Sequence, residues 1–132
     1  LGFDATLDFE PQLGVLSNPL ADGLKVSDYA VARRRMVSTR AHYEAHHSIC
    51  VGWDNTPRRG ENGIVFVNST PEQFETGLQE LVDACLHKPY EERLVFINAW
   101  NEWAEGNHLE PDSKHGLGYL DAVKRVTSPR PV

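Results

Sequence analysis

The residues best suited to chemistry are two glutamates in residues 94–112, LVFINAWNEWAEGNHLEPD. In an extended chain the Cα atoms of Glu102 and Glu105 would be about 10 Å apart, whereas on a helical turn their side chains would be neighbours at about 5 to 6 Å. Because Gly106 would break a strand, we expect a turn here. Two carboxyl groups roughly 5 to 10 Å apart are the arrangement of glycoside chemistry, one as acid and the other as base or nucleophile.

Aromatic and polar neighbours distinguish this pair from ordinary surface charges. Trp100 and Trp103 would place an apolar wall beside the carboxyl groups and would stack on sugar rings. Without these tryptophans, two solvated surface glutamates would be the favoured interpretation. With them a reaction site is favoured, and Asn101, His108 and Glu110 become candidates for contacts with a substrate.

A second polar cluster follows an apolar run at residues 48–53. Trp53, Asp54, Asn55 and Arg58, within the segment WDNTPRRG, are candidates to line a pocket for a polar ligand. Trp53 would give a flat apolar surface, and Asp54 would bond hydroxyl groups. The alternative is a local turn in which Asp54 and Asn55 bond nearby backbone groups. The spacing alone does not separate these two interpretations.

Apolar runs predict the strands that position both clusters. Residues 94–100 are predicted to be a buried strand of a sheet covered on both faces. Residues 48–53 are a second predicted strand, and a short strand is expected to end at residues 9–11. Residues 64–67 form a further short apolar segment. Reaction sites of α/β proteins commonly lie at the carboxyl ends of such strands.

The predicted helices alternate with these strands. The clearest covers residues 70–86, because Thr70 is a cap, Pro71 takes the first position and Gln73 completes a capping box. A weaker helix is expected from Asp28 to residue 39, capped by Ser27. A third is expected over residues 116–126, with these residues facing inward: Leu117, Leu120, Val123 and Val126. Residues 127–132 are predicted to be a frayed tail.

The alternation of strand and helix predicts an α/β fold with a parallel sheet. Three such units cannot close a barrel of eight, which usually takes about 250 residues. The chain is therefore expected to be either the C-terminal part of a (β/α)8 TIM-like barrel or a small open α/β domain.

Composition limits the classes of function. The chain has 132 residues, a formal net charge of −6 and a pI near 5.4, so it lacks the basic surface that neutralises nucleic-acid phosphates. Nucleic acid is excluded as a main partner. No apolar run reaches the roughly 18 to 20 residues that span a bilayer. The first residues resemble neither a signal peptide nor a natural start, so we expect a piece of a longer protein.

The cysteines and histidines favour neither a metal site nor a disulfide. Cys50 and Cys85 lack zinc-ligand spacing and are expected to be core thiols in a reducing, cytoplasmic compartment. His42, His46 and His47 have no carboxylate at a suitable spacing, so a solvated helix end is favoured over a metal site. No cofactor is predicted, and neither a Gly-rich phosphate loop nor an Asp-x-Asp pair is present.

The two clusters resemble the hallmark segments of the WbsX-type glycosyltransferase family of bacterial polysaccharide biosynthesis. The likeness is carried by residues 53–60 (WDNTPRRG), 96–106 (FINAWNEWAEG) and 109–112 (LEPD), and it extends from Gly2 to about residue 126. That family is related to glycoside hydrolase family 99, whose (β/α)8 barrel acts on α-mannosides. The resemblance implies that residues 1–126 are the C-terminal part of such a barrel, without its N-terminal half.

The resemblance also implies roles for individual residues. Glu105 would be the general acid/base. Glu102 would deprotonate a sugar 2-hydroxyl, so that this oxygen displaces the leaving group through a 1,2-anhydro intermediate with net retention. Glu110 would hold a substrate hydroxyl or order the loop. Ala104 departs from family 99, which often has histidine or another polar residue at this position.

The sequence therefore predicts a carbohydrate-active enzyme domain that acts on an oligosaccharide or polysaccharide of the lipopolysaccharide O-antigen type. The family name indicates a transferase, whereas the paired carboxylates suit a hydrolase or transglycosylase. Two alternatives stay open. One is a non-catalytic sugar-binding module. The other is an excised half-barrel that is inactive alone and pairs with the missing N-terminal half or with a second copy.

Overall fold

Three parallel strands form the sheet that carries the site. The computed structural model describes residues 2–12, 23–38 and 44–128. The strands β1 (Thr6–Leu7), β3 (Ala45–Cys50) and β5 (Val95–Asn98) are paired in the order β1-β3-β5. In this register Thr6 pairs with Ala45, and His47 pairs with Val95. Parallel neighbours need a crossover connection, and each connection here contains a helix.

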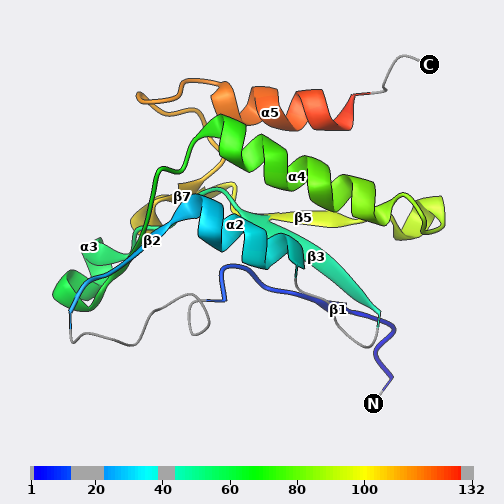
Figure 1. The fold of residues 1–132 in the computed structure, drawn as a ribbon, viewed down its shortest axis with the longest axis horizontal. Helices are drawn as coiled ribbons and strands as arrows, with labels where there is room; N and C mark the ends of the chain where they lie inside the picture. The colour runs from blue at the N-terminus through cyan, green and yellow to red at the C-terminus, as the bar shows by residue number, and fades with distance from the viewer. Residues whose placement is uncertain (1, 13–22, 39–43, 129–132) are drawn as a thin grey trace.

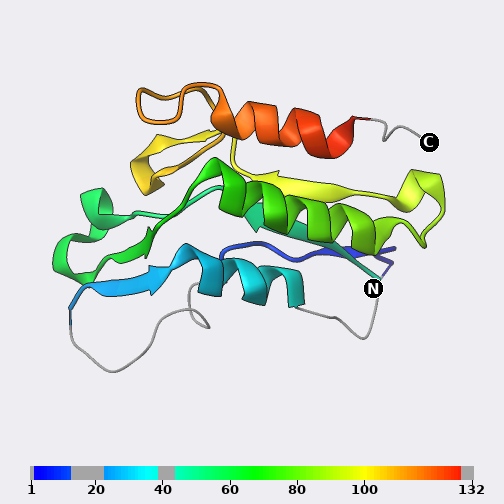
Figure 2. The same cartoon turned by 45° about the horizontal axis from the view of Figure 1, so that its top comes forward.

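The helices α2 (Tyr29–Ser38), α4 (Pro71–Cys85) and α5 (Gly118–Thr127) lie on one face of this sheet (Figures 1 and 2). Helix α4 lies between the other two and packs against both. This arrangement confirms the predicted α/β fold with a parallel sheet. The described strands leave the sheet open, with β1 and β5 at its edges, which is consistent with part of a barrel.

Short elements gather at the end of the molecule to which β3 and β5 point, where Figure 1 shows α3, β2 and β7. Strands β2 (Lys25–Asp28) and β4 (Ile64–Val67) form a parallel pair, and each leads into the next helix. The remaining elements at this end are α3 (Thr56–Arg59), the 3-10 helices η1 (Gly60–Asn62) and η3 (Trp103–Glu105), and the antiparallel strands β6 (Asn101–Glu102) and β7 (Asn107–His108). A further 3-10 helix, η2 (Tyr90–Glu92), precedes β5.

Helix α4 begins where the capping pattern predicts. The Thr70 Oγ1 accepts a hydrogen bond of 3.3 Å from the Gln73 amide, and Pro71 is the first helical residue. The apolar stripe predicted from the sequence is buried against the sheet and α5, including Phe74, Leu78 and Leu81. This helix is therefore structural, as its amphipathic pattern indicates.

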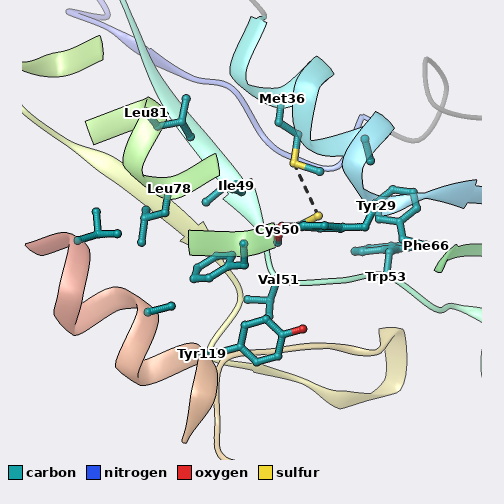
Figure 3. Packing of buried hydrophobic residues seen from close by; sticks show 14 residues of the cluster. Tyr29, Met36, Ile49, Cys50, Val51, Trp53, Phe66, Leu78, Leu81 and Tyr119 are labelled. Atoms are coloured by element: carbon teal, nitrogen blue, oxygen red, sulfur yellow. Dashed lines mark hydrogen bonds between the residues drawn. The ribbon is translucent and has the colours of Figure 1, made fainter. Parts of the chain in front are cut away.

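The core lies between the sheet and the three helices (Figure 3). The Tyr29 hydroxyl donates to the Cys50 carbonyl oxygen at 2.6 Å, and the Cys50 Sγ lies 3.8 Å from the Met36 Sδ. Burial raises the pKa of the Cys50 thiol well above its usual value. Cys50 and Cys85 are both buried free thiols, which confirms their prediction as core residues.

The start of α2 differs from the prediction. Ser27 lies in β2 and is not a helix cap. The Asp28 Oδ1 instead accepts a hydrogen bond from the Ala30 amide at 2.8 Å, because the chain passes directly from strand to helix at this residue. Helix α2 ends at Ser38, and residue 39, where the helix was predicted to end, lies outside the described residues.

The histidines also differ from the prediction. His46 and His47 lie in β3, not at a helix end, because pairing with β1 at Ala45 and His46 and with β5 from His47 onward requires an extended chain. The strand predicted at residues 48–53 therefore runs from Ala45 to Cys50, three residues earlier at each end. His42 lies outside the described residues, as do residues 13–22.

The prediction that residues 94–100 are buried on both faces of the sheet is wrong. Val95 and Ile97 pack against the core, whereas Phe96 is 41% exposed and contacts the His46 ring on the other face. The described helices cover only one face, which explains the difference.

The C-terminal helix begins two residues later than predicted. Leu117 precedes α5 and is exposed, so it does not face inward. The buried residues of α5 are Tyr119, Ala122 and Val126. Thr127, predicted as part of a frayed tail, is the last residue of α5, where its hydroxyl donates to the Val123 carbonyl at 2.8 Å. Residues 129–132 lie outside the described part of the chain.

Among the described residues, no helix has the length and apolar character needed to cross a bilayer.

Candidate functional site

The two clusters singled out in the sequence lie in contact. The Asp54 amide donates a hydrogen bond of 2.7 Å to the Glu105 carbonyl oxygen. Gly106 follows in a left-handed conformation, with φ of 56°, and a Cβ added there would lie 3.1 Å from the Asp54 Cβ. Glycine therefore allows the segment after β3 and the turn after Glu105 to approach each other closely.

Arg58 joins the two glutamates. Its Nη2 lies 3.0 Å from the Glu102 Oε1, and its Nη1 lies 3.2 Å from the Glu105 Oε1. The Glu102 and Glu105 side chains are 41% and 21% exposed, so both carboxylates are accessible. Because one guanidinium group contacts both, the two carboxylates lie at a common site, as the paired carboxylates of glycoside chemistry do.

The turn between the glutamates agrees with the prediction from Gly106. Residues Trp103–Glu105 form the 3-10 helix η3, and Gly106 ends it. A helical turn places side chains three positions apart on the same side. The antiparallel pairing of β6 with β7, in which Glu102 is opposite Asn107, holds the two ends of this turn together.

The position of Arg58 depends on the turn before it. The Asp54 Oδ1 accepts hydrogen bonds from the Thr56 amide at 2.9 Å and the Thr56 hydroxyl at 2.6 Å. The Asn55 carbonyl accepts from the Arg58 and Arg59 amides, each at 3.0 Å. The local turn weighed for Asp54 is therefore present in the structure.

Asn55 forms hydrogen bonds within the protein. Its side chain is buried, and its Oδ1 accepts a hydrogen bond of 2.7 Å from the Ile64 amide at the start of β4. The Asn55 amide in turn donates to the Ile64 carbonyl at 3.2 Å. Both contacts fix α3 relative to β4, and the carboxamide oxygen predicted to meet a ligand is already paired.

The three tryptophans have different surroundings. Trp53 belongs to the buried core (Figure 3), and it is also among the residues that line a cavity beside Asp54. Trp100 and the neighbouring Asn101 are exposed. Trp103 is half exposed and stacks on the His108 ring, with centroids 3.6 Å apart and planes inclined by 14°. The side chain that contacts the carboxylates of both Glu102 and Glu105 is Arg58.

The predicted residues after Gly106 support this stack. The Trp103 Nε1 donates to the Glu110 Oε2 at 2.6 Å, and the His108 Nε2 lies 3.1 Å from the Asp112 Oδ2. Partial burial raises the pKa of Asp112, but hydrogen bonds from the His115 amide and from His108 outweigh it and lower this pKa overall. Glu110 is thus hydrogen-bonded to Trp103 within this loop.

Two buried polar residues in the site region were not predicted. Asn107 is completely buried, and its Oδ1 accepts from the Val51 amide at 3.1 Å and the Gly52 amide at 3.4 Å. A cavity of about 200 Å³ lies beside Asp54 and Gly106 and reaches Tyr119. Nothing in the spacing of the sequence marks Asn107, because its partners lie in a distant segment.

Glu10 is the second buried residue, at the carboxyl end of β1. It is only 3% exposed, and burial raises the pKa of its carboxyl group. Its amide donates to the Ser48 Oγ at 3.0 Å, and its carbonyl accepts from the Asn98 Nδ2 at 2.6 Å. Glu10 therefore ties the segment that follows β1 to both β3 and β5. The sequence predicted only that a short strand ends at residues 9–11.

Within the described residues, no group of three or more His, Cys, Asp or Glu side chains is arranged to hold a metal ion.

Comparisons with known proteins agree with the resemblance drawn from the motifs. No solved structure matches the chain. Proteins from two strains of Xanthomonas campestris pv. campestris, each described as "Uncharacterized protein WxcX", are 34% identical to it over 141 aligned positions. The alignment covers 99% of this chain and 20% of each relative, so the chain spans about a fifth of their length. The model of the family described as "Glycosyltransferase WbsX" matches residues 9–123. The chain belongs to the WbsX glycosyltransferase family.

Proposed function

We propose that the longer protein containing this chain cleaves or transfers glycosidic bonds in bacterial polysaccharide metabolism, and that Glu102 and Glu105 are its paired catalytic carboxylates. The observation that carries this proposal is the Arg58 guanidinium group in contact with both side chains. Family membership supports a carbohydrate-active enzyme. The position of the pair after β5 also agrees with the usual place of reaction sites in α/β proteins.

The proposed reaction proceeds in two steps. In the first, the Glu102 carboxylate takes the proton of the sugar 2-hydroxyl, and this oxygen forms a bond to C1. The C1 bond to the leaving group breaks as Glu105 protonates the leaving oxygen. In the second, Glu105 takes a proton from the acceptor hydroxyl, whose oxygen attacks C1 and opens the 1,2-anhydro ring while Glu102 returns the proton to O2. Two inversions give net retention.

Arg58 has a defined place in this proposal. Its two N–H groups hold the carboxylates on one side of a common site, and orientation of this kind is a large part of catalysis by paired groups. Trp100 and Asn101 are exposed beside the pair and are proposed to contact the substrate, together with Trp103 and His108. Asp54 is proposed to contribute through its second carboxylate oxygen.

The uncovered face of the sheet bears on the partner of this chain. We propose that the rest of the longer protein covers this face, where Phe96 is exposed and β1 and β5 leave open edges. The relatives extend far beyond the aligned region, which supports a covering segment from the same chain. A second copy of the chain is the alternative that size-exclusion chromatography of the 132 residues alone would reveal.

The test uses the full-length protein and a panel of α-mannan and O-antigen-type oligosaccharides. Release of reducing sugar and formation of transfer products are measured for the wild type, Glu102→Gln, Glu105→Gln and the control Glu91→Gln. We expect both site variants to lose at least about 100-fold in turnover and the control to keep it. The control glutamate is exposed and lies in η2.

The products separate the alternatives. Hydrolysis products with a retained anomeric configuration support the glycosidase reaction, and products carrying a new acceptor sugar support transfer. Turnover that requires a nucleotide-sugar donor and survives both substitutions would show that the pair has another role. Binding without any turnover would favour the non-catalytic sugar-binding module.

A further inference from the structure

Asn107 lies beside both proposed catalytic residues without being able to reach a substrate. It pairs with Glu102 across the β6–β7 ladder and follows Glu105 by two positions. Its side chain is completely buried, at 0% exposure. Any effect of Asn107 on a reaction would therefore act through the residues that it holds in place.

The side chain of Asn107 is anchored to the end of β3. Its Oδ1 accepts hydrogen bonds from the amides of Val51 and Gly52, at 3.1 and 3.4 Å. The Val51 amide also donates to the Asn98 carbonyl at the end of β5, at 3.2 Å. The carboxamide oxygen therefore lies where β3 and β5 end, and it ties the hairpin that bears the glutamates to the segment that follows β3.

The segment that follows β3, to which Asn107 is anchored, continues directly to Asp54 and Arg58, which contact the turn that bears the glutamates. The chain runs from Gly52 to Asp54, whose amide bonds the Glu105 carbonyl, and then to Arg58, which contacts both carboxylates. The Arg58 contacts are made by exposed side chains, and such pairs contribute little to holding a structure in place. The buried contacts of Asn107 and the Asp54 backbone bond are therefore the firm connections between the two halves.

The chemistry of the side chain indicates that its acceptor oxygen is what the position needs. The two backbone donors assign the oxygen of the carboxamide, and the Nδ2 is buried without a partner among the described residues. An unpaired buried donor costs roughly 1 to 3 kcal/mol. A side chain that only filled space would avoid this cost by being apolar. A role in holding the amides of β3 explains why a polar group is present.

We infer that Asn107 is a positioning residue, which sets the place of Glu102 and Glu105 by anchoring their hairpin to the amides of Val51 and Gly52. This inference rests on the proposed function for the part that concerns turnover. The anchoring itself is a property of the fold and is measurable without any substrate.

The test compares Asn107→Ala, which removes the acceptor, with Asn107→Asp, which keeps it, in the full-length protein. Asn62→Ala is the matched control, since this asparagine is exposed in η1. We expect Asn107→Ala to lower kcat about 10- to 100-fold with KM within about twofold, because a small misplacement of catalytic groups has an effect of this size. Asn107→Asp should restore most of kcat, and Asn62→Ala should leave it unchanged.

Hydrogen exchange measured by mass spectrometry supplies the readout without activity. In Asn107→Ala, peptides covering residues 50–54 and 101–106 should exchange faster, and in Asn107→Asp they should resemble the wild type. If Asn107→Ala does not fold, as judged by circular dichroism, Asn107→Ser takes its place, because its hydroxyl is too short to reach both amides.

The outcomes distinguish this inference from the proposed function. A folded variant without the acceptor, with faster exchange but kcat within twofold of the wild type, would overturn the positioning role. If the wild type acts on no glycoside, the proposed function fails, and the anchoring is then judged on exchange alone. Unchanged exchange in residues 101–106 would refute it, and faster exchange restored by Asn107→Asp would support it.

Discussion

The amide of Asp54 and the carbonyl oxygen of Glu105 are joined by a hydrogen bond of 2.7 Å. It connects the segment after β3 with the turn that carries the acidic pair, although the two residues are far apart in the sequence. A backbone hydrogen bond does not depend on the side chains of its partners. The effects of substitution at this junction therefore arise from the neighbouring residues that bring the two backbones together.

Gly106→Ala tests the close approach to Asp54. An alanine there would place a Cβ 3.1 Å from the Asp54 Cβ, in addition to the left-handed strain at φ of 56°. Gly116→Ala is the control, because Gly116 also has φ of 56° and nothing within 4 Å of an added Cβ. We expect Gly106→Ala to lower the free energy of unfolding by about 1 to 3 kcal/mol more than the control, the usual effect of overpacking. Equal urea denaturation midpoints for both would show that the junction adapts.

Arg58→Ala separates stability from function. The ion pairs of Arg58 with Glu102 and Glu105 are exposed, so their loss should change the free energy of unfolding by less than about 1 kcal/mol. Turnover by the full-length protein should fall at least about 10-fold, because the two carboxylates lose their common contact. Arg59→Ala is the control, since the described part of the chain shows no ion pair for Arg59. An equal fall in turnover for both variants would contradict a specific role of Arg58.

Glu10→Gln tests the buried carboxyl group at the end of β1. Burial raises its pKa above the usual value of 4.5, so folding is opposed when this group is ionised. The protein has its full stability when Glu10 is protonated in both states, at a pH below the pKa of this group in the unfolded chain. It loses part of that stability as the pH rises through the higher pKa of Glu10 in the folded protein. Glu10→Gln should therefore be more stable than the wild type at pH 7, and the difference should vanish below about pH 4.

Chemical denaturation across this pH range gives the comparison for Glu10. Glu61→Gln serves as the control, because Glu61 is exposed in η1. A stability difference for Glu10→Gln that stays constant with pH would show that the carboxyl group has the same pKa in the folded and unfolded chain.

Thr70→Ala tests the cap of α4. The Thr70 hydroxyl accepts from the Gln73 amide, and loss of such a cap lowers the free energy of unfolding by about 0.5 to 2 kcal/mol. Thr76→Ala, in the exposed middle of the same helix, should have little effect. Thermal and urea denaturation measure both. A larger loss for Thr76→Ala than for Thr70→Ala would contradict the assignment of the cap.

Local patterns in the sequence determined much of the fold. The alternation of apolar runs and amphipathic segments predicted the parallel α/β arrangement, and the Thr70, Pro71 and Gln73 pattern predicted the start of α4. These features follow from contacts between residues close in the chain, so they are readable without the rest of the protein. The turn between Glu102 and Glu105 was predicted for the same reason, from Gly106.

The burial of individual side chains was less predictable, since it depends on which elements cover each face of the sheet or helix. Phe96 and Leu117 read as inward residues from their apolar character, yet both are exposed, because one has no described layer over it and the other precedes its helix. Trp53 was expected to line a pocket, and the structure also makes it part of the core, which its spacing in the sequence did not indicate.

The sequence by itself determined which residue types gather at the ends of β3 and β5 and the family to which they belong. Only the tertiary structure decided which atoms meet: Arg58 with both glutamates, and the buried Asn107 with the amides at the end of β3. These contacts join residues more than forty positions apart, as the separations of 44, 47, 55 and 56 show. Spacing along the chain carries no information about them, because the parallel pairing of β3 with β5 is what brings the two strand ends together.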